Sequence, residues 1–212
     1  MRRIAMRDLS RAAAFRLITG GISPRPVALV TTRNLDGSCN AAPFSAFNYV
    51  SDDPPILAIG FDTHGDEGHR PGERKDTLVN IERTGEFVVN MVDETLLDAA
   101  VACASDYPAG ISEIQVLGLT LAPSADVDCP RLMNTQIAWE CVRHSTIPLS
   151  ATRTLLLGQI ISASLREDLL LPDETRIDPD KWFPIGRLGG PRYTRTTNRL
   201  TRPIAPYKPA EK

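Results

Sequence analysis

The run Arg74-Lys75-Asp76-Thr77 contains side chains that could bind a phosphate group. Asp76 or Thr77 can cap a helix that begins there, and Gly85 suits the left-handed position after its last residue. The first N–H groups of a helix are unpaired and carry partial positive charge, so a phosphate docks there readily, and a lysine and a threonine add donors. The same residues are equally typical of a capped helix with a solvated lysine. The pattern alone leaves both interpretations open.

A second group of polar side chains precedes this helix. His64 and His69 are five positions apart, a spacing that matches no standard zinc site, and no cysteine lies nearby. The carboxylates of the same stretch are those of Asp62, Asp66 and Glu67. We interpret residues 62–74 as a solvated loop and expect no metal ion there.

The motifs of several common enzyme classes are missing. The chain has no G-x-S-x-G, H-E-x-x-H, G-x-G-x-x-G or G-x-x-x-x-G-K-[ST] sequence, and it has three histidines. A serine hydrolase, a zinc protease, a Rossmann enzyme and a P-loop enzyme are therefore poorly supported.

Charge is distributed unevenly along the chain. Residues 1–33 contain seven Arg and one acidic residue, residues 186–212 contain seven Arg or Lys and one acidic residue, and residues 34–185 contain 10 basic and 24 acidic residues. Clustered basic side chains can bind nucleic acid. These ends, however, are interleaved with apolar residues and lack blocks of five or six like charges. We expect no nucleic-acid partner; the ends would pack on the acidic body, or one arginine would reach an anionic ligand.

Length and composition favour one globular domain. The chain has 212 residues, of which 42% are hydrophobic and 24% are charged, enough to bury a sizeable core. No apolar stretch approaches the roughly 20 residues that cross a bilayer, and the run Ala12-Ala13-Ala14-Phe15 ends at Arg16, too early for a signal peptide. The four cysteines form no C-x-x-C pair. We expect a cytoplasmic protein with reduced, mostly buried thiols and no membrane partner.

Apolar and β-branched runs predict more strands than helices. A hairpin signal, Asn34-Leu35-Asp36-Gly37, joins the first two strands. The expected strands cover residues 27–32, 38–47, 56–61, 87–92, 136–147 and 154–165. Helical spacing predicts helices over 9–19, from 76 or 77 to 84, and over 96–104, the last capped by Asp93 or Thr95. This balance favours a closed antiparallel barrel with helices set against it.

Several motifs follow one another in a characteristic order. They are Pro24-Arg25-Pro26-Val27-Ala28-Leu29-Val30-Thr31-Thr32, Asn40-Ala41-Ala42-Pro43-Phe44-Ser45-Ala46-Phe47-Asn48, Pro54-Pro55, Lys75-Asp76-Thr77, Gly85-Glu86-Phe87-Val88-Val89-Asn90, Trp139-Glu140-Cys141 and Arg187-Leu188-Gly189-Gly190. This set resembles the flavin reductase-like family of FMN-binding split barrels, in the branch that includes flavoredoxin and nitrilotriacetate monooxygenase component B. The resemblance spans nearly the whole chain, although the 62–74 loop is longer and richer in His and acidic residues than the family pattern.

The resemblance implies a mainly β fold with flanking helices. The chain would form a single split-barrel domain over residues 1–212, with a six-stranded antiparallel barrel of Greek-key type, an N-terminal helix and an extended C-terminal segment. It also implies a homodimer that binds FMN in a groove at the dimer interface.

Site residues follow from the resemblance by position. Thr31 and Thr32 would lie along the flavin, and residues 42–47 would offer backbone groups and the Ser45 hydroxyl to the ring edge. The full predicted set for FMN is Arg25, Thr31, Thr32, Ala42, Pro43, Phe44, Ser45, Phe47, Arg74, Lys75 and Thr77, of which Arg25, Lys75 and Thr77 would hold the phosphate. Because side chains alternate across a strand, one of the two phenylalanines is expected in the barrel core.

The implied reaction needs little from side chains. Hydride passes from NAD(P)H to the flavin, and the protein orients the reactants and excludes water, so no catalytic side chain is predicted. The implied function is an NAD(P)H:flavin oxidoreductase, which could supply reduced flavin to a partner monooxygenase. Two alternatives stay open: a flavoredoxin-like FMN electron carrier without NAD(P)H turnover of its own, and an oxidase or reductase of a small organic substrate.

Overall fold

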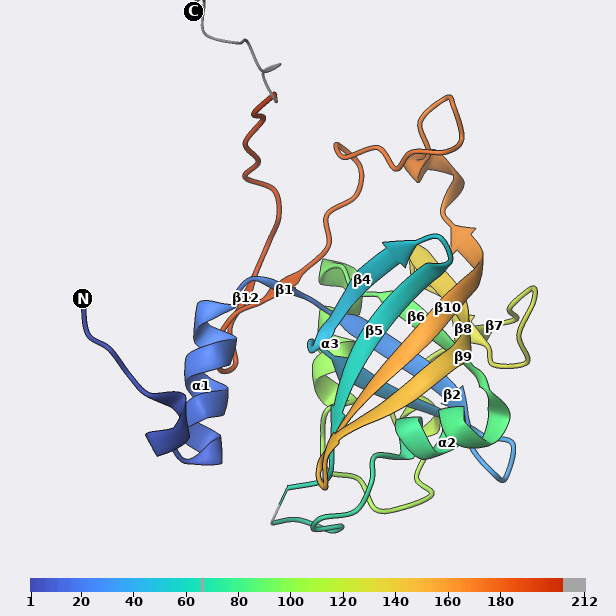
Figure 1. Cartoon of the computed structure of the whole chain (residues 1–212). Coiled ribbons are helices and arrows are strands. Elements are labelled where there is room, and N and C mark those ends of the chain that lie inside the picture. The colour runs from blue at the N-terminus through green and yellow to red at the C-terminus, as the bar shows by residue number, and fades with distance from the viewer. Residues whose placement is uncertain (66, 204–212) are drawn as a thin grey trace, which may run out of the picture.

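The main element of the molecule is a seven-stranded antiparallel sheet (Figure 1). The computed structural model describes residues 1–65 and 67–203, so Asp66 and the end of the basic C-terminal segment, 204–212, lie outside the described residues. The strands, in their order across the sheet, are β3 (Cys39–Phe44), β2 (Ala28–Arg33), β6 (Glu86–Met91), β9 (Ile137–Ser150), β10 (Arg153–Leu165), β5 (Pro55–Asp62) and β4 (Phe47–Asp52). The predicted mainly β, antiparallel architecture is confirmed.

The sheet curls into a barrel. Its two edge strands, β3 and β4, are consecutive in the chain, so the short connection between them brings the two edges of the sheet together. Only Ser45 and Ala46 separate them, and the Ala46 carbonyl accepts a hydrogen bond from the Gly60 N–H of β5 at 2.7 Å. Six strands were expected and seven are present. The difference arises at this bend, where the predicted 38–47 strand ends at Phe44 and the chain resumes as β4 up to Asp52.

Large apolar side chains fill the barrel interior. Those that are fully or almost fully buried are Ala28, Val30, Leu57, Ile59, Phe61, Leu78, Ile81, Phe87, Val89, Cys141 and Leu156. Leu78 and Ile81 come from α2 (Asp76–Thr84), which closes one end of the barrel (Figure 1). The Phe87 ring reaches so close to β10 that a Cβ at Gly158 would lie 2.3 Å from its Cζ atom. A glycine at position 158 is therefore needed for this ring to fit.

The start of α2 differs from the prediction. Its N-cap is Lys75, which makes no side-chain capping bond, and Asp76 lies in the first turn. Asp76 is already inside the helix, and its carboxylate accepts a hydrogen bond from the Arg70 guanidinium. The end is as predicted, since Gly85 follows the helix in the left-handed conformation, with φ 79°.

Two helices cover the outer face of β2 and β3. These are α3 (Glu94–Ala102), capped by the Asp93 side chain as predicted, and the short α4 (Glu113–Val116). Apolar side chains of both helices pack against Leu29 and Ala41 of the sheet. The remaining short elements are η1 (Met6–Asp8), β1 (Arg25–Pro26), β7 (Leu121–Ala122), β8 (Arg131–Leu132), η2 (Glu167–Leu169), β11 (Gly186–Arg187) and β12 (Tyr193–Thr194).

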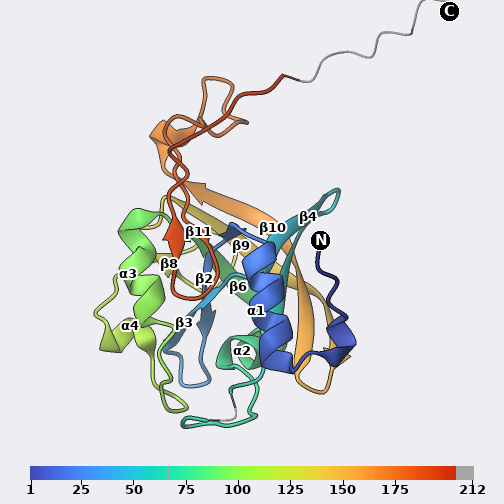
Figure 2. The same cartoon turned by 90° about the vertical axis from the view of Figure 1, so that its left-hand side faces the viewer.

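The N-terminal helix stands apart from the barrel (Figure 1), and Figure 2 views it with the barrel behind. The predicted 9–19 helix is present as α1 (Arg11–Gly21), whose N-cap Ser10 accepts a hydrogen bond from the Ala13 N–H at 3.2 Å. None of its residues is buried. This helix therefore gains little stability from packing within its own chain.

The thiols are buried, as expected. All four cysteines are free, and burial raises the pKa of Cys103 to about 12. In the part of the chain that the structure describes, no helix is long and apolar enough to cross a membrane. Within the same residues, no three His, Cys, Asp or Glu side chains are arranged to hold a metal ion.

A buried carboxylate holds the loop that follows β7 against the barrel. Glu140 on β9 is fully buried, and its side-chain oxygens accept hydrogen bonds from the Ala125 N–H at 3.0 Å and the Asp126 N–H at 2.7 Å. Ser164 of β10 lies 3.5 Å from the same carboxylate. Glu140 therefore satisfies backbone groups that would otherwise be buried without partners.

Replacing Glu140 by leucine is expected to destabilise the protein. Each N–H left without a partner costs about 1–3 kcal/mol, and chemical denaturation measures the loss. Glu86 is a suitable control because it makes a comparable bond to the Asp128 N–H at 2.8 Å in an exposed place. We expect Glu86→Leu to cost clearly less than Glu140→Leu. Equal losses would contradict the role assigned to burial.

Candidate functional site

The outer edge of β3 is covered along one half and open along the other. Near its start, the Cys39 carbonyl accepts a bond from the Ser112 hydroxyl, and the Ala41 N–H donates to the Glu113 carboxylate at 3.0 Å. Backbone groups of alternate residues point to the same edge of a strand. Pro43 and Ser45 therefore direct theirs to the side away from β2, beyond the part that the segment at α4 covers.

This open edge suits the predicted contact with a flavin ring. Residues 42–45 and Phe47 are partly exposed, and Pro43, which has no N–H to leave unpaired, is tolerated in an edge strand. The edge offers the Pro43 carbonyl as an acceptor and the Ser45 N–H and hydroxyl as donors. An isoalloxazine ring carries both donors and acceptors along one side, so these groups fit it.

Both phenylalanines of this segment point into the barrel. Phe44 and Phe47 pack against the buried core, and the Phe44 ring centroid lies 4.6 Å from that of Phe61. The prediction that one of the two faces inward rested on strict alternation. This prediction is corrected: the bend at Ser45 and Ala46 breaks the alternation, so Phe44 and Phe47 point to the same side.

Thr31 and Thr32 are not accessible. Both are completely buried: the Thr31 hydroxyl donates to the Pro130 carbonyl at 2.8 Å, and the Thr32 hydroxyl accepts from the Asn80 amide at 3.1 Å. One face of β2 is covered by the segment at Pro130 and the other by α2, and the expectation that these two residues lie along the flavin stays a prediction. Both hydroxyls hold β2 in place.

Arg25 is also engaged elsewhere. Its guanidinium donates to the carbonyls of Thr19, Ile22 (2.9 Å) and Leu188 (3.2 Å). Burial and the neighbouring Arg187 guanidinium lower the pKa of Arg25. β1 and α2 lie toward opposite ends of the barrel (Figure 1). Within one chain, Arg25 joins the end of α1 to the C-terminal segment and is not brought to Lys75. Its assignment to the phosphate stays a prediction.

The remaining phosphate candidates differ in availability. Thr77 is buried, with its hydroxyl accepting a bond from the Asn40 amide at 3.0 Å, and Arg74 forms an ion pair with Glu82 at 2.6 Å. Lys75 stands at the uncapped N-terminus of α2 and is partly exposed. Of these residues, Lys75 is therefore the one whose position and partners suit a phosphate.

Several described residues of the 62–74 loop make hydrogen bonds within the loop and to α2. The His64 N–H donates to the Glu73 carbonyl at 2.7 Å, and Thr63 pairs with Arg74 across the loop. Arg70 bonds both Glu73, at 2.8 Å, and the first turn of α2. These contacts fold the loop back onto α2, and they place His64 beside Lys75.

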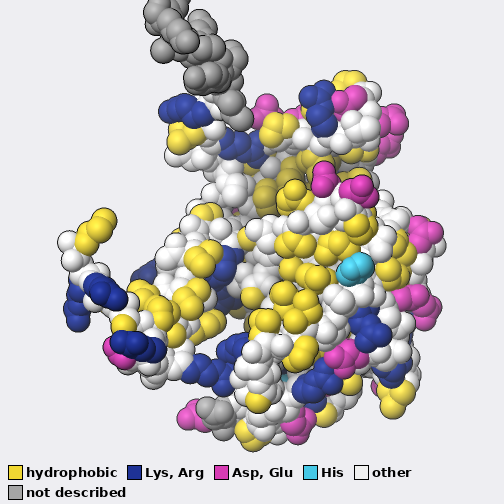
Figure 3. All heavy atoms as spheres, in the orientation of Figure 1, with side chains coloured by type: hydrophobic (Ala, Val, Ile, Leu, Met, Phe, Trp, Pro, Cys, Tyr) yellow, Lys and Arg dark blue, Asp and Glu magenta, His cyan; other side chains and the backbone are white. Residues whose placement is uncertain are grey.

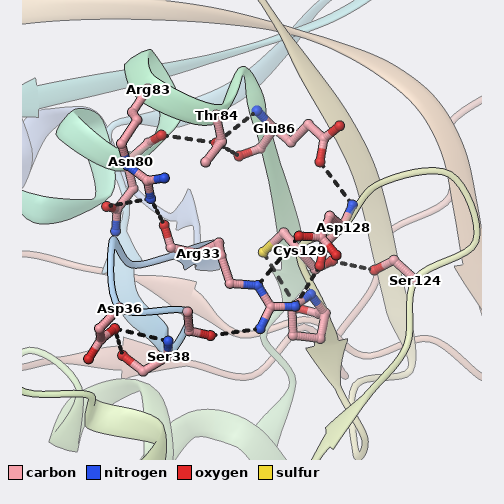
Figure 4. Close-up of polar contacts among 12 residues, drawn as sticks. Arg33, Asp36, Ser38, Asn80, Arg83, Thr84, Glu86, Ser124, Asp128 and Cys129 are labelled. Carbon is pink, nitrogen blue, oxygen red and sulfur yellow. Dashed lines mark hydrogen bonds and ion pairs between the residues drawn. The ribbon is translucent and has the colours of Figure 1, made fainter.

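A polar network around Arg33 and Arg83, which was not predicted from the sequence, holds α2 in position (Figure 4). The Arg33 guanidinium at the end of β2 donates to the Gly37 carbonyl at 3.0 Å and the Asp128 carbonyl at 2.7 Å. Arg83 of α2 donates to the Arg33 carbonyl and lies near Asn80. The network fixes α2 relative to the β2–β3 hairpin, and no spacing of residue types along the chain signals it.

A cavity that is large enough for a ligand lies away from the residues predicted to bind FMN. Figure 3 shows the surface hollowed between the α1 segment and the barrel. A cavity of about 60 Å³ touches Arg74, and one of about 550 Å³ lies near the ends of β9 and β10. The larger cavity is lined by Thr95, Arg131, Met133, Asn134, Thr135, Gln136, Ser164, Leu165 and Arg166. None of these residues was predicted from the sequence.

The structure is an antiparallel barrel with one open strand edge and a basic helix N-terminus without a side-chain cap. The comparisons agree: the model for the flavin reductase like domain matches residues 20–176, and the chain belongs to this family. The 2-nitrobenzoate 2-nitroreductase NbaA of Pseudomonas fluorescens is 42% identical, with a TM-score of 0.88 over 99% of each chain.

Two further solved structures are similar. Nitrilotriacetate monooxygenase component B from Bacillus cereus is 32% identical, with a TM-score of 0.88 over 95% of this chain and 98% of that one. A Shewanella frigidimarina protein with a split barrel domain has a TM-score of 0.79 over 94% of this chain and 96% of that one. Its identity is 18%, so this likeness shows the fold alone.

Proposed function

We propose that this protein is an FMN-dependent oxidoreductase of the cytoplasm that accepts hydride from NAD(P)H and passes it to a flavin. The observation that carries the proposal is the open edge of β3 in a member of the flavin reductase family, with Lys75 at the uncapped start of α2. Pro43 and Ser45 would contact the ring edge, and Lys75 would hold the phosphate. The reduced flavin could serve a monooxygenase, since component B of such an enzyme is 32% identical to this chain.

The chemistry suits a site without an acid–base pair. When bound, FMN accepts hydride from nicotinamide at its ring, so the protein supplies orientation and exclusion of water. Backbone groups at the β3 edge and the Ser45 hydroxyl give the ring fixed partners. None of them has to gain or lose a proton for the hydride to move.

A second candidate function is the reduction of a small nitroaromatic substrate on the same barrel. The 42% identity with a 2-nitrobenzoate 2-nitroreductase over almost the whole chain favours it. In this alternative, electrons from NAD(P)H would reach a nitro group instead of a free flavin. A third candidate is an FMN electron carrier without NAD(P)H turnover of its own, and one assay distinguishes all three.

Acceptor dependence distinguishes these functions. The FMN-loaded protein is mixed anaerobically with NADH or NADPH, and nicotinamide oxidation is followed with free FMN or 2-nitrobenzoate as the acceptor. Multiple turnovers with free FMN support the proposed function. Turnover with 2-nitrobenzoate alone supports the second candidate, and bound flavin without nicotinamide oxidation supports an electron carrier.

We also propose that the active form is a homodimer. Phe15 and Ile18 of α1 and Ile22, which directly follows the helix, are apolar residues spaced three and four apart, and each is 46–65% exposed. Apolar side chains in such a row are typical of an interface, and most soluble oligomers are two-fold symmetric. A second copy that packed against α1 would also narrow the hollow beside it.

Light scattering is expected to give twice the mass of one chain. Ile18→Asp should shift the protein toward monomer because it places a charge in the apolar row. Leu35→Asp is the matched control, since Leu35 is 86% exposed in the β2–β3 hairpin. A wild-type monomer that binds FMN fully would contradict the dimer.

A further inference from the structure

The cavity of about 550 Å³ near the ends of β9 and β10 has a basic wall. Arg131 and Arg166 line it, and no Asp or Glu of the described residues does. Residues 34–185, to which every lining residue belongs, contain 10 basic and 24 acidic residues. The two arginines therefore contrast with the acidic segment around them and make the cavity attractive to an anion.

Arg131, on β8, is half-buried and has few partners among the residues that the structure describes. Its guanidinium has one hydrogen-bond acceptor there, the Leu132 carbonyl, 3.4 Å from Nη1. Nε is buried without a partner, and no described carboxylate forms an ion pair with the group. Arg166, in contrast, is paired with Asp168 at 2.5 Å. A cation withdrawn from water is costly unless an anion accompanies it, so an anion in the cavity would stabilise Arg131.

Hydrogen bonds hold the wall of the cavity in position. The Leu132 N–H donates to the Asn90 side-chain oxygen at 2.8 Å, and the Arg166 N–H donates to the Gln136 carbonyl at 2.9 Å. The Gln136 side-chain amide also donates to the carboxylate of Asp93, the N-cap of α3. A ligand would therefore meet groups that the fold has already placed, which lowers the cost of binding.

The rest of the wall suits a small organic molecule. Sites for small molecules have volumes of about 300–1,000 Å³, and this cavity lies within that range. Met133 and Leu165 add apolar surface, whereas Asn134, Thr135 and Ser164 add uncharged polar groups. These features favour a ligand with an apolar body and one anionic group.

The number of unpaired charges favours a carboxylate as that anionic group. One unpaired guanidinium balances the single charge of a carboxylate, and its planar fork matches the two carboxylate oxygens. A phosphate monoester carries about two negative charges at neutral pH. The second arginine of the wall already has Asp168 as its counter-ion.

The cavity lies apart from the residues predicted to bind FMN. Strands β2 and β6 separate β3 from β9 in the sheet, and β10 ends at the end of the barrel opposite α2 (Figure 1). None of the lining residues belongs to the predicted FMN set. Within one chain, a ligand in this cavity would therefore be a second molecule beside the flavin.

We propose that this cavity binds a small organic carboxylate, with Arg131 as its counter-ion and with Met133 and Leu165 against its apolar body. The anionic groups of FMN and NAD(P)H are phosphates, so this ligand belongs to another chemical class. The inference does not rest on the proposed hydride transfer, because it needs only the cavity and its charge.

Binding of 4-fluorobenzoate, followed by fluorine NMR, tests the proposal. This probe has one carboxylate and one apolar ring. Arg131→Gln removes the positive charge, whereas Arg131→Lys keeps it. Arg166→Gln is the matched control, because Arg166 lines the same cavity but is paired with Asp168. The uncharged 4-fluorobenzamide and the doubly charged 4-fluorophenyl phosphate are the comparison ligands.

We expect Arg131→Gln to weaken 4-fluorobenzoate binding about tenfold or more and Arg131→Lys to retain part of the affinity. Arg166→Gln should weaken it less than about threefold, and 4-fluorobenzamide should not distinguish the variants. Equal losses in the two Gln variants, or no saturable binding up to about 10 mM, would overturn the proposal. Tighter binding of the phosphate than of the carboxylate would also overturn it.

A measurement on the wild-type protein does not depend on the variants folding. With methyl-labelled methionine, the Met133 resonance should shift as 4-fluorobenzoate binds, and that of Met91, which packs against the barrel core, should not. Met133→Leu assigns the resonance. Saturation with 4-fluorobenzoate without a shift of Met133 would overturn the location.

The same titration on FMN-loaded protein separates this inference from the proposed function. The affinity for 4-fluorobenzoate should stay within about threefold of its value without FMN, because the two sites are distinct. Loss of 4-fluorobenzoate binding on loading with FMN would place the probe in the flavin site and overturn this inference alone. A protein that binds 4-fluorobenzoate through Arg131 but binds no FMN would instead overturn the proposed function.

Discussion

Lys75→Ala is expected to weaken FMN binding roughly ten- to hundredfold and to leave riboflavin binding almost unchanged. A charge-assisted hydrogen bond contributes on the order of 1.5–3 kcal/mol, which corresponds to that range of affinity. The effect should be specific because Lys75 stands at the uncapped end of α2, and its removal takes no side chain out of the barrel core. Fluorescence titration with both flavins measures it.

Arg74→Ala is the matched control for this prediction. Arg74 is the neighbour of Lys75 in the chain, but its guanidinium pairs with Glu82. We expect its removal to change FMN affinity by less than about threefold, since exposed ion pairs contribute little. If Lys75→Ala weakens FMN and riboflavin together, Lys75 is structural and the phosphate binds elsewhere.

Phe87→Ala is expected to cause the largest loss of stability of any change considered. Phe87 is fully buried in the barrel core, and its ring fills the space that Gly158 leaves open. Truncating a buried phenylalanine costs about 3–5 kcal/mol. For a protein of this size, each kcal/mol of lost stability lowers Tm by about 2–4 °C. Thermal denaturation measures the resulting decrease in Tm.

Two comparisons make the Phe87 result informative. Leu35→Ala changes an exposed apolar residue and should alter the free energy of unfolding by less than about 0.5 kcal/mol. Gly158→Ala adds a methyl group against the same ring and should cost about 1–3 kcal/mol by overpacking. A Phe87→Ala protein with an unchanged Tm would show that this packing does not stabilise the barrel.

Much of the fold could be predicted because its signals are local. The β-branched run 27–32, the hairpin residues 34–37 and Gly85 each determine their own conformation, and the structure confirms them. The bend at Ser45 and Ala46 was missed because no glycine or proline stands at the bend itself. Ala46 bonds to Gly60, a contact that appears only when β4 pairs with β5.

The site was predicted less completely, because whether a side chain is free to bind a ligand depends on residues that are far away in the sequence. Thr31 and Arg25 have suitable chemistry, but Pro130 and Leu188 occupy their donors. Residue type and order cannot reveal such competition. The open edge at Ser45 agrees with the predicted position of the ring, and Lys75 with that of the phosphate. The identification of those residues as FMN contacts stays a prediction.

An anaerobic flavin titration, followed by NADH or NADPH, tests the central claim most directly. The account predicts that the protein binds close to one FMN per subunit, with a change in its visible spectrum, and that nicotinamide addition bleaches the bound flavin. No spectral or fluorescence change at tens of micromolar FMN would contradict flavin binding. Bound flavin that neither NADH nor NADPH bleaches would contradict the proposed hydride transfer.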